Sequence, residues 1–227
     1  AGLTGEGSVL ALADRNNSRV LIWKQPPEAD TPPDLVLGQP DFRSIAPGKG
    51  LEGMNWPSAL SLGGGRLAVA DTENHRLLLW NALPTQSGQP ADLALDLSAL
   101  RERVTPRRNL IWPWGVWTDG RRLVAAATHG ASLLIWNQWP TSGDSLPDLI
   151  VQDSRMGTPR HISSNGEWLA VWDHNAKLGG TQGDGRGTFL YRAFPTAADQ
   201  QADLLLPFQA VGLGLPGGAF LGLGDGL

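Results

Sequence analysis

The chain repeats itself, and this repeat restricts its possible folds more than any other feature. The segment ADRNNSRVLIW at residues 13–23 returns as ADTENHRLLLW at 70–80 and, with more changes, as ATHGASLLIW at 127–136. Self-similarity at a fixed spacing is the signature of an array of equal structural units, each of which buries its apolar surface against the next.

Anchor residues place the units along the chain. Asp14, Asp71 and Thr128 follow one another at intervals of 57 residues. Two further copies of the repeat have Asp173 and Asp225 at the corresponding position. Turn residues divide each unit into four short apolar runs, which favours four strands per unit. In the second unit we expect these strands near residues 58–62, 66–70, 75–80 and 92–97.

The composition favours β-structure that is rich in turns. The 227 residues include 29 Gly and 17 Pro, and no stretch has an apolar period of 3.6 residues long enough to prefer a helix. Four short antiparallel strands per unit, repeated around an axis, describe the blades of a β-propeller. We therefore predict an all-β propeller in a single domain, with four full blades and part of a fifth. The repeats cover about residues 1–43, 44–99, 100–153, 154–207 and, in part, 208–227.

Two of the repeats carry a family signature. The pattern D-x-x-N-x-R, followed by three apolar residues and Trp, occurs at 14–23 and again at 71–80. It resembles the NHL repeat, and LVLGQPDF at 35–42 is similar to bacterial NHL-repeat proteins with a long connection between blades. The resemblance implies a six-bladed ring. Because the chain supplies fewer units than that, either it is truncated or its ring closes in an unusual way.

Most of the repeated residues have a structural explanation. Asp14, Asn17 and Arg19 are expected to hold the turn between the second and third strands, because the short polar side chains can bond nearby backbone amides and the Arg can pair with the Asp. Large flat side chains that recur once per blade fill the wedges between sheets. This packing role is expected first, and a role as a ligand platform second, for Trp23, Trp80, Trp136, Tyr191, Trp56 and Trp112.

The candidate site is expected where the chain departs from its own repeat, because a repeat supplies a scaffold and its variations supply function. The connections between blades and the turns between second and third strands emerge on one face of a propeller. His75, His129 and His174 fall in those turns, and His161 falls at the start of an innermost strand. The histidines therefore mark that face as the binding face.

The innermost strands supply the strongest candidates. Trp114, Trp117, Arg160 and His161 lie where the innermost strands of the third and fourth units begin, so we expect them to face the central channel. Two indoles beside an imidazole and a guanidinium suit an aromatic, sugar-like or anionic small ligand. The alternative is that they plug the channel or cover an apolar floor.

Several classes of function are excluded or weakened. A chain without Cys has no disulfide, thiolate zinc site or Cys nucleophile. A net charge of -4 and a pI near 5.5 argue against a general nucleic-acid binder. No apolar run approaches the roughly 20 residues of a membrane span. The positions aligned with His161 hold Ala59 and Gly115, so no metal site is predicted. No cofactor and no catalytic residue are predicted either.

We therefore expect a non-catalytic binding scaffold that recognises a protein partner or a small ligand on this face. The alternatives are a metal-dependent lyase or lactone hydrolase with its site at the channel mouth, and an RNA-binding NHL domain. An incomplete ring would expose an apolar blade face and favour self-association. The lack of Cys, the many Trp and the bacterial-looking repeat favour a periplasmic or extracellular location.

Overall fold

The computed structural model describes residues 2–104, 111–178 and 185–207. Within these residues the strands form four sheets, and each sheet pairs four consecutive strands antiparallel in chain order. The first blade consists of β1 (Leu3–Glu6), β2 (Val9–Asp14), β3 (Arg19–Trp23) and β4 (Leu35–Leu37). The second consists of β5 (Pro57–Gly63), β6 (Arg66–Asp71), β7 (Arg76–Trp80) and β8 (Leu93–Asp96). The third consists of β9 (Pro113–Thr118), β10 (Leu123–Ala127), β11 (Ser132–Trp136) and β12 (Leu149–Val151). The fourth consists of β13 (Pro159–Ser164), β14 (Leu169–Ala176), β15 (Gly185–Tyr191) and β16 (Leu204–Pro207).

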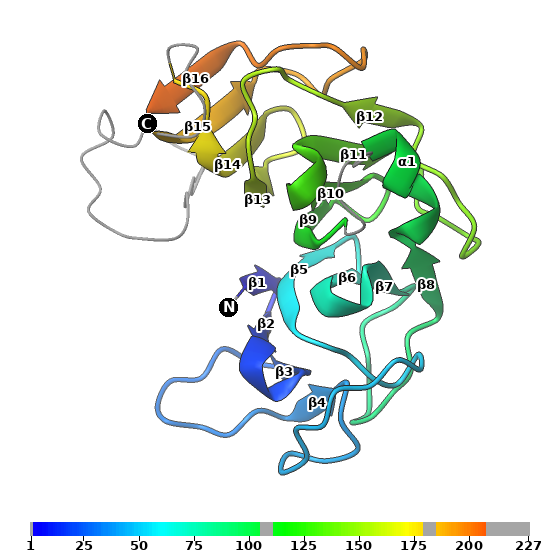
Figure 1. Cartoon of the computed structure of the whole chain (residues 1–227). Coiled ribbons are helices and arrows are strands. Elements are labelled where there is room, and N and C mark those ends of the chain that lie inside the picture. Colours follow the sequence, from blue (N-terminus) through cyan, green and yellow to red (C-terminus); the bar gives the residue numbers. More distant parts are fainter. Residues whose placement is uncertain (1, 105–110, 179–184, 208–227) are drawn as a thin grey trace.

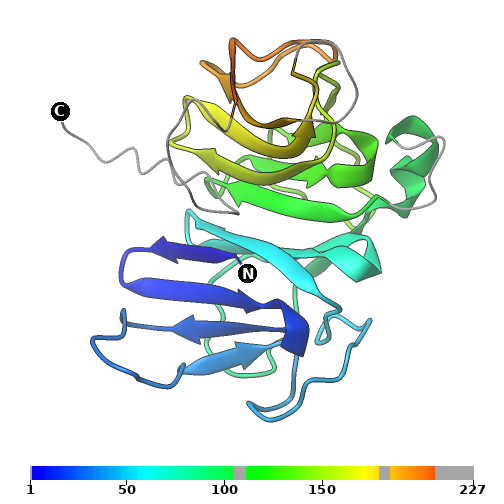
Figure 2. The ribbon, with the colours of Figure 1, turned by 60° about the vertical axis from the view of Figure 1, so that its left-hand side comes forward.

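The blades are arranged around an axis. In Figure 1 the first strand of each blade, β1, β5, β9 or β13, lies on the inner side of an arc, and the fourth strand lies on its outer side. Figure 2 shows the first blade as a twisted four-stranded sheet. The inner strands of consecutive blades contact one another, from β1 to β5, to β9 and to β13. This arrangement is a β-propeller, as the repeat predicted; the partial fifth unit predicted at 208–227 lies outside the described residues.

Apolar side chains fill the wedge between each pair of neighbouring blades. Between the first and second blades, Val20 and Ile22 on one sheet belong to the same buried cluster as Leu60, Val69 and Leu78 on the other. Equivalent clusters join the second blade to the third and the third to the fourth. Each fully buried side chain of this size contributes roughly 1.5–3 kcal/mol to folding, so contacts between blades hold the arc together.

The aromatic residue that ends each third strand takes part in this packing, with one exception. Trp80, Trp136 and Tyr191 are at most 2% exposed, as expected for wedge-filling side chains. Trp23 is partly exposed, and its indole nitrogen donates a 2.9 Å hydrogen bond to the carbonyl oxygen of Thr31. The difference arises because Trp23 belongs to the first blade, one face of which has no neighbour among the described residues.

The uncovered face of the first blade is apolar. Strands β2 and β3 alternate between buried and partly exposed residues, whereas β7 of the second blade is buried along nearly its whole length. Leu12 and Leu21 are partly exposed on this face, and Leu3 is 53% exposed. At the same repeat positions of the second blade, Leu60 and Val69 are buried against the first blade.

Short helical turns complete the described fold. A single 3-10 turn joins the second and third strands in three blades, as η1 (Arg15–Asn17), η2 (Thr72–Asn74) and η4 (Thr128–Gly130). The second blade is followed by η3 (Leu97–Leu100) and α1 (Arg101–Val104). None of the helical segments in the described residues has the length and apolarity needed to cross a membrane.

The predicted contacts of the repeat anchors are present. The Nε of Arg19 lies 2.7 Å from a carboxylate oxygen of Asp14, and the Nε of Arg76 lies 2.7 Å from one of Asp71. The amide nitrogen of Asn17 also donates to the Asp14 carboxylate at 2.9 Å. The structural role expected for these residues is therefore confirmed.

The third unit aligns one residue differently from our prediction. Ala127 precedes η4 and pairs across the turn with Ser132, in the way that Asp71 precedes η2 and pairs with Arg76. The expected equivalence of Thr128 with the Asp anchors is therefore wrong. The third blade has Ala in place of Asp, and Thr128 is the first residue of the turn that follows.

Candidate functional site

The innermost strands of three blades share a backbone irregularity near their first residue. In the second, third and fourth blades, the pairing between the first and second strands skips one residue, and the skipped residues are Ser58, Trp114 and Arg160. A β-bulge of this kind takes a side chain out of the regular alternation, and such bulges are frequent beside active and binding sites. We call the end of the propeller where these strands begin the mouth.

Two tryptophans that directly precede these strands have an unusual backbone. Trp56 has φ 60° and Trp112 has φ 49°, in the left-handed region that bulky residues avoid. Each precedes a Pro, which normally favours an extended conformation. Strain of this type costs of order 1–3 kcal/mol and collects at functional sites. The sequence predicted a packing role first and a ligand platform second for both residues, and the structure places them, partly exposed, at the mouth.

Five side chains at the mouth contact one another, and we call them the mouth cluster: Arg15, Trp56, Trp112, Trp114 and Arg160. The ring centroid of Trp114 lies 5.5 Å from that of Trp56 and 5.9 Å from that of Trp112. The guanidinium carbon of Arg15 lies 4.4 Å from the centroid of the Trp56 ring. The guanidinium carbon of Arg160 lies 4.4 Å from the centroid of the Trp114 ring. Because Arg15 comes from the first blade and Arg160 from the fourth, the site depends on the curvature of the whole arc.

The mouth cluster is rich in hydrogen-bond donors that lack partners. The Nε atoms of Arg15 and Arg160 and the Nε1 atom of Trp112 are buried, and none has a hydrogen-bond partner among the described residues. Burial lowers the pKa of Arg160, and the nearby positive charge of Arg15 lowers it further, against the opposing effect of Asp173. A small hollow of about 210 Å³ lies on the first blade; residues 12–16, which include Arg15, line it, and the indoles of the cluster do not.

A second aromatic group from the fourth blade adjoins the cluster. The ring centroid of Trp172 lies 5.7 Å from that of His161 and 5.7 Å from that of His174. Burial lowers the pKa of His161 to about 4, with a further contribution from Arg160. Burial also lowers the pKa of His174, and Arg160 adds to this shift. Both imidazoles are therefore neutral at pH 7, and the Nδ1 atoms of both are buried without a partner in the described structure.

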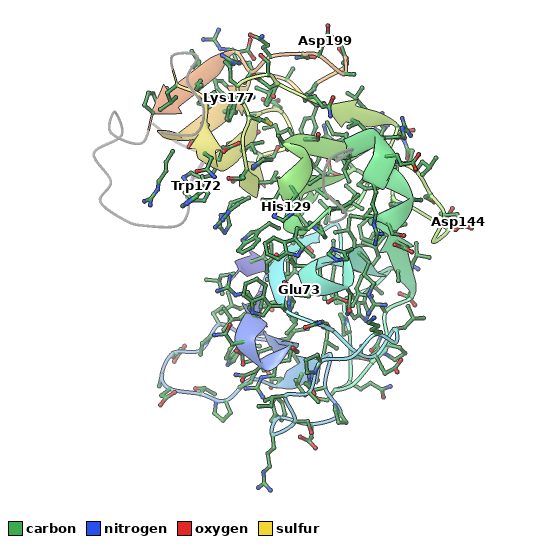
Figure 3. The ribbon with its side chains drawn as sticks, in the orientation of Figure 1. Glu73, His129, Asp144, Trp172, Lys177 and Asp199 are labelled. Atoms are coloured by element: carbon green, nitrogen blue, oxygen red, sulfur yellow. The ribbon has the colours of Figure 1, made fainter. Side chains whose placement is uncertain are left out.

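Of the other predicted site residues, His129 and His174 lie beside the mouth cluster, whereas Trp117 packs between blades. The ring of His129 lies 4.5 Å from that of Trp112, so His129 adjoins the cluster. In Figure 3, His129 and Trp172 lie toward the inner side of the arc, whereas Asp144 and Asp199 lie on its outer rim. His174 lies within β14 and not in a turn as expected, because that strand extends to Ala176.

Trp117 is not part of the mouth cluster. Its ring packs 5.3 Å from Phe194 in the wedge between the third and fourth blades, and its Nε1 donates to the carbonyl oxygen of Ser164 at 3.2 Å. The expected grouping of Trp117 with Trp114 and His161 is therefore not found. Residues three apart on a strand point to opposite faces, which is a reason to separate Trp117 from Trp114 even before the bulge is known.

A wider depression of about 390 Å³ lies beside η2 and is not lined by residues of the mouth cluster. It is lined by Lys49, Glu73, His75, Asp96 and Arg101, among others. Burial lowers the pKa of His75, and the positive charge of Arg101 adds to this effect. Charges of both signs line this depression, and Arg76 beside it is already paired with a carboxylate.

Of the three strand positions considered for a metal site in the channel, one carries a histidine. Ala59 and Gly115 occupy the ladder positions equivalent to His161, as the sequence alignment predicted. Among the residues that the structure describes, no three His, Asp or Glu side chains gather closely enough to hold a metal ion.

Comparisons with known proteins match the fold and not the sequence. No protein-family model matches the chain, and no curated protein matches it either. A Bacteroides uniformis protein with a provisional assignment as a 6-phosphogluconolactonase superposes with a TM-score of 0.56 at 14% identity. The match covers 88% of this chain and 54% of that one.

Two further solved structures resemble the chain less closely. The PQQ-bound aldose sugar dehydrogenase of Streptomyces coelicolor has a TM-score of 0.46 at 16% identity, over 80% of this chain and 57% of that chain. U3-55K has a TM-score of 0.47 at 13% identity, and the match covers 82% of this chain and 45% of that chain. The chain thus spans about half the length of each of these three structures. At 14% identity, the likeness to the Bacteroides uniformis protein shows the fold alone.

Sequence reasoning missed Arg15 and Trp172 as a member and a neighbour of the site, and it gave a ligand platform only as the second role of Trp56 and Trp112. A signal for Arg15 was present, because it stands in the first unit at the position where the second unit has Thr72. The left-handed conformation of the two tryptophans and the bulges leave no comparable mark in the sequence.

Proposed function

We propose that this chain is a non-catalytic binding scaffold and that it takes a small ligand with a planar or sugar-like ring at the mouth cluster. One observation carries this proposal: three indoles, from Trp56, Trp112 and Trp114, lie with ring centroids 5.5 to 6.4 Å apart where the inner strands begin. Indole rings pack well against flat or ring-shaped ligands, and small-molecule sites are usually lined by aromatic side chains with a few placed polar groups.

The alternative role of a simple plug accounts for less of what is observed. A plug needs only bulk, yet two of the three indoles are held in a strained backbone conformation. The buried Nε1 of Trp112 also has no partner among the described residues, and a buried donor without a partner costs about 1–3 kcal/mol. A bound ligand that accepts a hydrogen bond there would offset that cost.

Isothermal titration calorimetry with D-glucose, D-glucuronate, D-glucose 6-phosphate and benzoate tests this proposal on the purified chain. We expect at least one of these probes to bind and Trp112→Leu to weaken its binding about tenfold or more, which corresponds to 1.4 kcal/mol. Trp168→Leu is the matched control, because Trp168 is 37% exposed in the hairpin between β13 and β14, at the opposite end of the strand. Binding of none of the probes, or equal binding by Trp112→Leu and the unsubstituted chain, would refute the proposal.

The metal-dependent lyase or lactone hydrolase remains the second candidate from the sequence. The chain resembles the provisional lactonase in fold, but a likeness at 14% identity supports no activity. Elemental analysis of the purified protein and an assay with δ-gluconolactone separate the two candidates. Stoichiometric metal together with hydrolysis would favour the enzyme over the scaffold.

Three further predictions concern the family, a role in RNA binding and the location of the protein. Assignment to the NHL family rests on the repeat pattern alone, since no family model matches. An RNA-binding role predicts salt-dependent binding in an RNA titration, because phosphate contacts release counterions. The location outside the cytoplasm rests on composition and can be checked by fractionating the source cells.

A further inference from the structure

Two guanidinium groups from opposite ends of the arc converge on one indole. Arg160 stands over the Trp114 ring with its guanidinium carbon 4.4 Å from the centroid, and that of Arg15 lies 5.7 Å from the same centroid. An indole face attracts one cation by roughly 0.5–2 kcal/mol. Two cations at one ring also repel each other, and at a partly desolvated site water screens that repulsion less well than at the surface.

Neither guanidinium forms an ion pair with a carboxylate among the described residues. The ion pairs within the described parts of the chain involve Arg19, Arg76, Arg122 and Arg155, and not the two arginines of the mouth cluster. Asp14, next to Arg15 in the chain, pairs with Arg19 instead.

The carboxylate of Asp173, which acts on Arg160 through its charge, is also engaged elsewhere. It accepts hydrogen bonds from the backbone amides of Gly157, Thr158 and Asn175, at 2.8 to 2.9 Å. Neither guanidinium of the mouth cluster therefore has an ion-pair partner among the described residues, and the charge of Asp173 acts on Arg160 alone.

The groups without partners at the mouth cluster can only donate hydrogen bonds. Guanidinium and indole nitrogens carry hydrogens and have no acceptor capacity. The Nε atoms of Arg15 and Arg160 and the Nε1 of Trp112 are all buried without a partner in the described structure. A ligand that satisfies all three must present several acceptor atoms, and a neutral ring compound with hydroxyl groups would supply no charge for the two guanidiniums.

We propose that the ligand of the mouth cluster carries an oxyanion, a carboxylate or a phosphate, that Arg15 and Arg160 bind together while its ring packs on the indoles. This inference rests on the proposed function and names the chemistry of its ligand. Planar guanidinium groups match the oxygen spacing of both anions, so one arrangement serves either chemical class.

Calorimetric titration at low salt tests the inference with four probes: D-glucose, D-glucuronate, D-glucose 6-phosphate and inorganic phosphate. We expect at least one of the two sugar anions to bind about tenfold or more tightly than D-glucose. Tighter binding of D-glucuronate identifies a carboxylate site, and tighter binding of D-glucose 6-phosphate identifies a phosphate site. Affinity for inorganic phosphate close to that for D-glucose 6-phosphate would show that the indoles add nothing to recognition, and would contradict the arrangement proposed.

Substitutions assign the effect to the two arginines. Arg15→Gln and Arg160→Gln should each weaken binding of the sugar anion about tenfold, and should weaken any binding of D-glucose much less. Arg160→Lys, which keeps the charge but loses the planar fork, should retain part of the affinity. Arg121→Gln is the matched control, because Arg121 is exposed in the hairpin between β9 and β10. Thermal unfolding monitored by circular dichroism shows whether each variant is folded.

The possible failures are distinguishable. If the sugar anions bind no more tightly than D-glucose, or if the arginine variants bind them as the unsubstituted chain does, the inference about the anion is wrong while the ring-binding scaffold stands. If none of the four probes binds, and benzoate with its carboxylate on a planar ring does not bind either, both the inference and the proposed function are refuted.

Discussion

The hydroxyl group of Thr72 donates a 2.7 Å hydrogen bond to the carbonyl oxygen of Pro113, the first residue of the inner strand of the next blade. One blade further on, the hydroxyl of Thr128 makes the same bond to the carbonyl oxygen of Pro159, at 2.6 Å. Both threonines are buried and begin the turn after the second strand. The same residue type therefore ties each of these turns to the neighbouring blade.

Replacing Thr72 by Val should destabilise the fold. The isosteric change removes the donor and leaves the buried carbonyl oxygen of Pro113 without that partner, which costs about 1–3 kcal/mol. Thr85→Val is the control, because Thr85 is exposed. Urea denaturation followed by fluorescence measures the free energy of unfolding of both variants. Equal values for the two would contradict the role given to this bond.

The two anchor ion pairs should differ in their contribution to stability. The Asp71 side chain is 0% exposed and its partner Arg76 is 12% exposed, whereas Asp14 is 22% exposed in its pair with Arg19. Asp71→Ala leaves a buried guanidinium without its carboxylate, so we expect a loss of about 3–5 kcal/mol. Asp14→Ala should cost about 1 kcal/mol, because water can replace part of the interaction. Chemical denaturation that gave the reverse order would overturn this reading of the repeat.

Gly115→Ala should disturb the contact between the third and fourth blades. A Cβ atom at this position would lie 1.9 Å from the carbonyl oxygen of Arg160, which is backbone and cannot move aside alone. We expect a lower melting temperature and faster amide hydrogen exchange in β13, because that strand must shift to relieve the clash. Gly5→Ala is the control, since its Cβ atom would come no closer than 3.3 Å to another residue. Unchanged exchange in β13 would show that the two inner strands are not packed as described.

His161 should make the fold sensitive to mild acid. Burial lowers its pKa to about 4 in the folded chain, and the adjacent charge of Arg160 contributes. Because the unfolded value is about 6.5, the unfolded state gains a proton first as the pH falls. The stability associated with neutral His161 is therefore complete above pH 6.5 and is lost as the pH falls toward 4, by up to about 3 kcal/mol.

His161→Gln isolates this effect from other titrating groups, including His174 on the adjacent strand. We expect the free energy of unfolding of the unsubstituted chain to fall more steeply between pH 7 and pH 4.5 than that of the variant. Parallel curves in denaturant titrations at several pH values would show that His161 does not titrate in this way.

The repeat predicts the scaffold well because each of its signals has a local cause. Apolar runs separated by turn residues place the strands of the second blade within two residues of their observed limits. The spacing of five residues between Asp71 and Arg76 brings them face to face across the turn, where they pair. The prediction for the third unit was wrong because Thr128 lies 57 residues after Asp71 and was therefore aligned with it. The strand pairing places Ala127 at the anchor position instead.

The site was harder to predict because it depends on contacts between distant blades. Arg15 and Trp114 are far apart in the sequence and meet only through the curvature of the arc. A bulge at Trp114 and the left-handed conformation of Trp112 then decide which way the indoles point. Neither feature has a sequence pattern of its own here, whereas the exclusion of Trp117 follows from simple alternation along a strand.

The skipped residue in the inner strands of the second, third and fourth blades separates two tasks that most sheet positions combine, which are pairing in the ladder and presenting a side chain. Trp114 and Arg160 have no partner in the ladder, so exchanging their side chains changes charge and shape at the channel opening while the register of the sheet is kept. A propeller built in this way can acquire new ligand preferences through single substitutions at one recurrent position, without a matching change elsewhere in the blade.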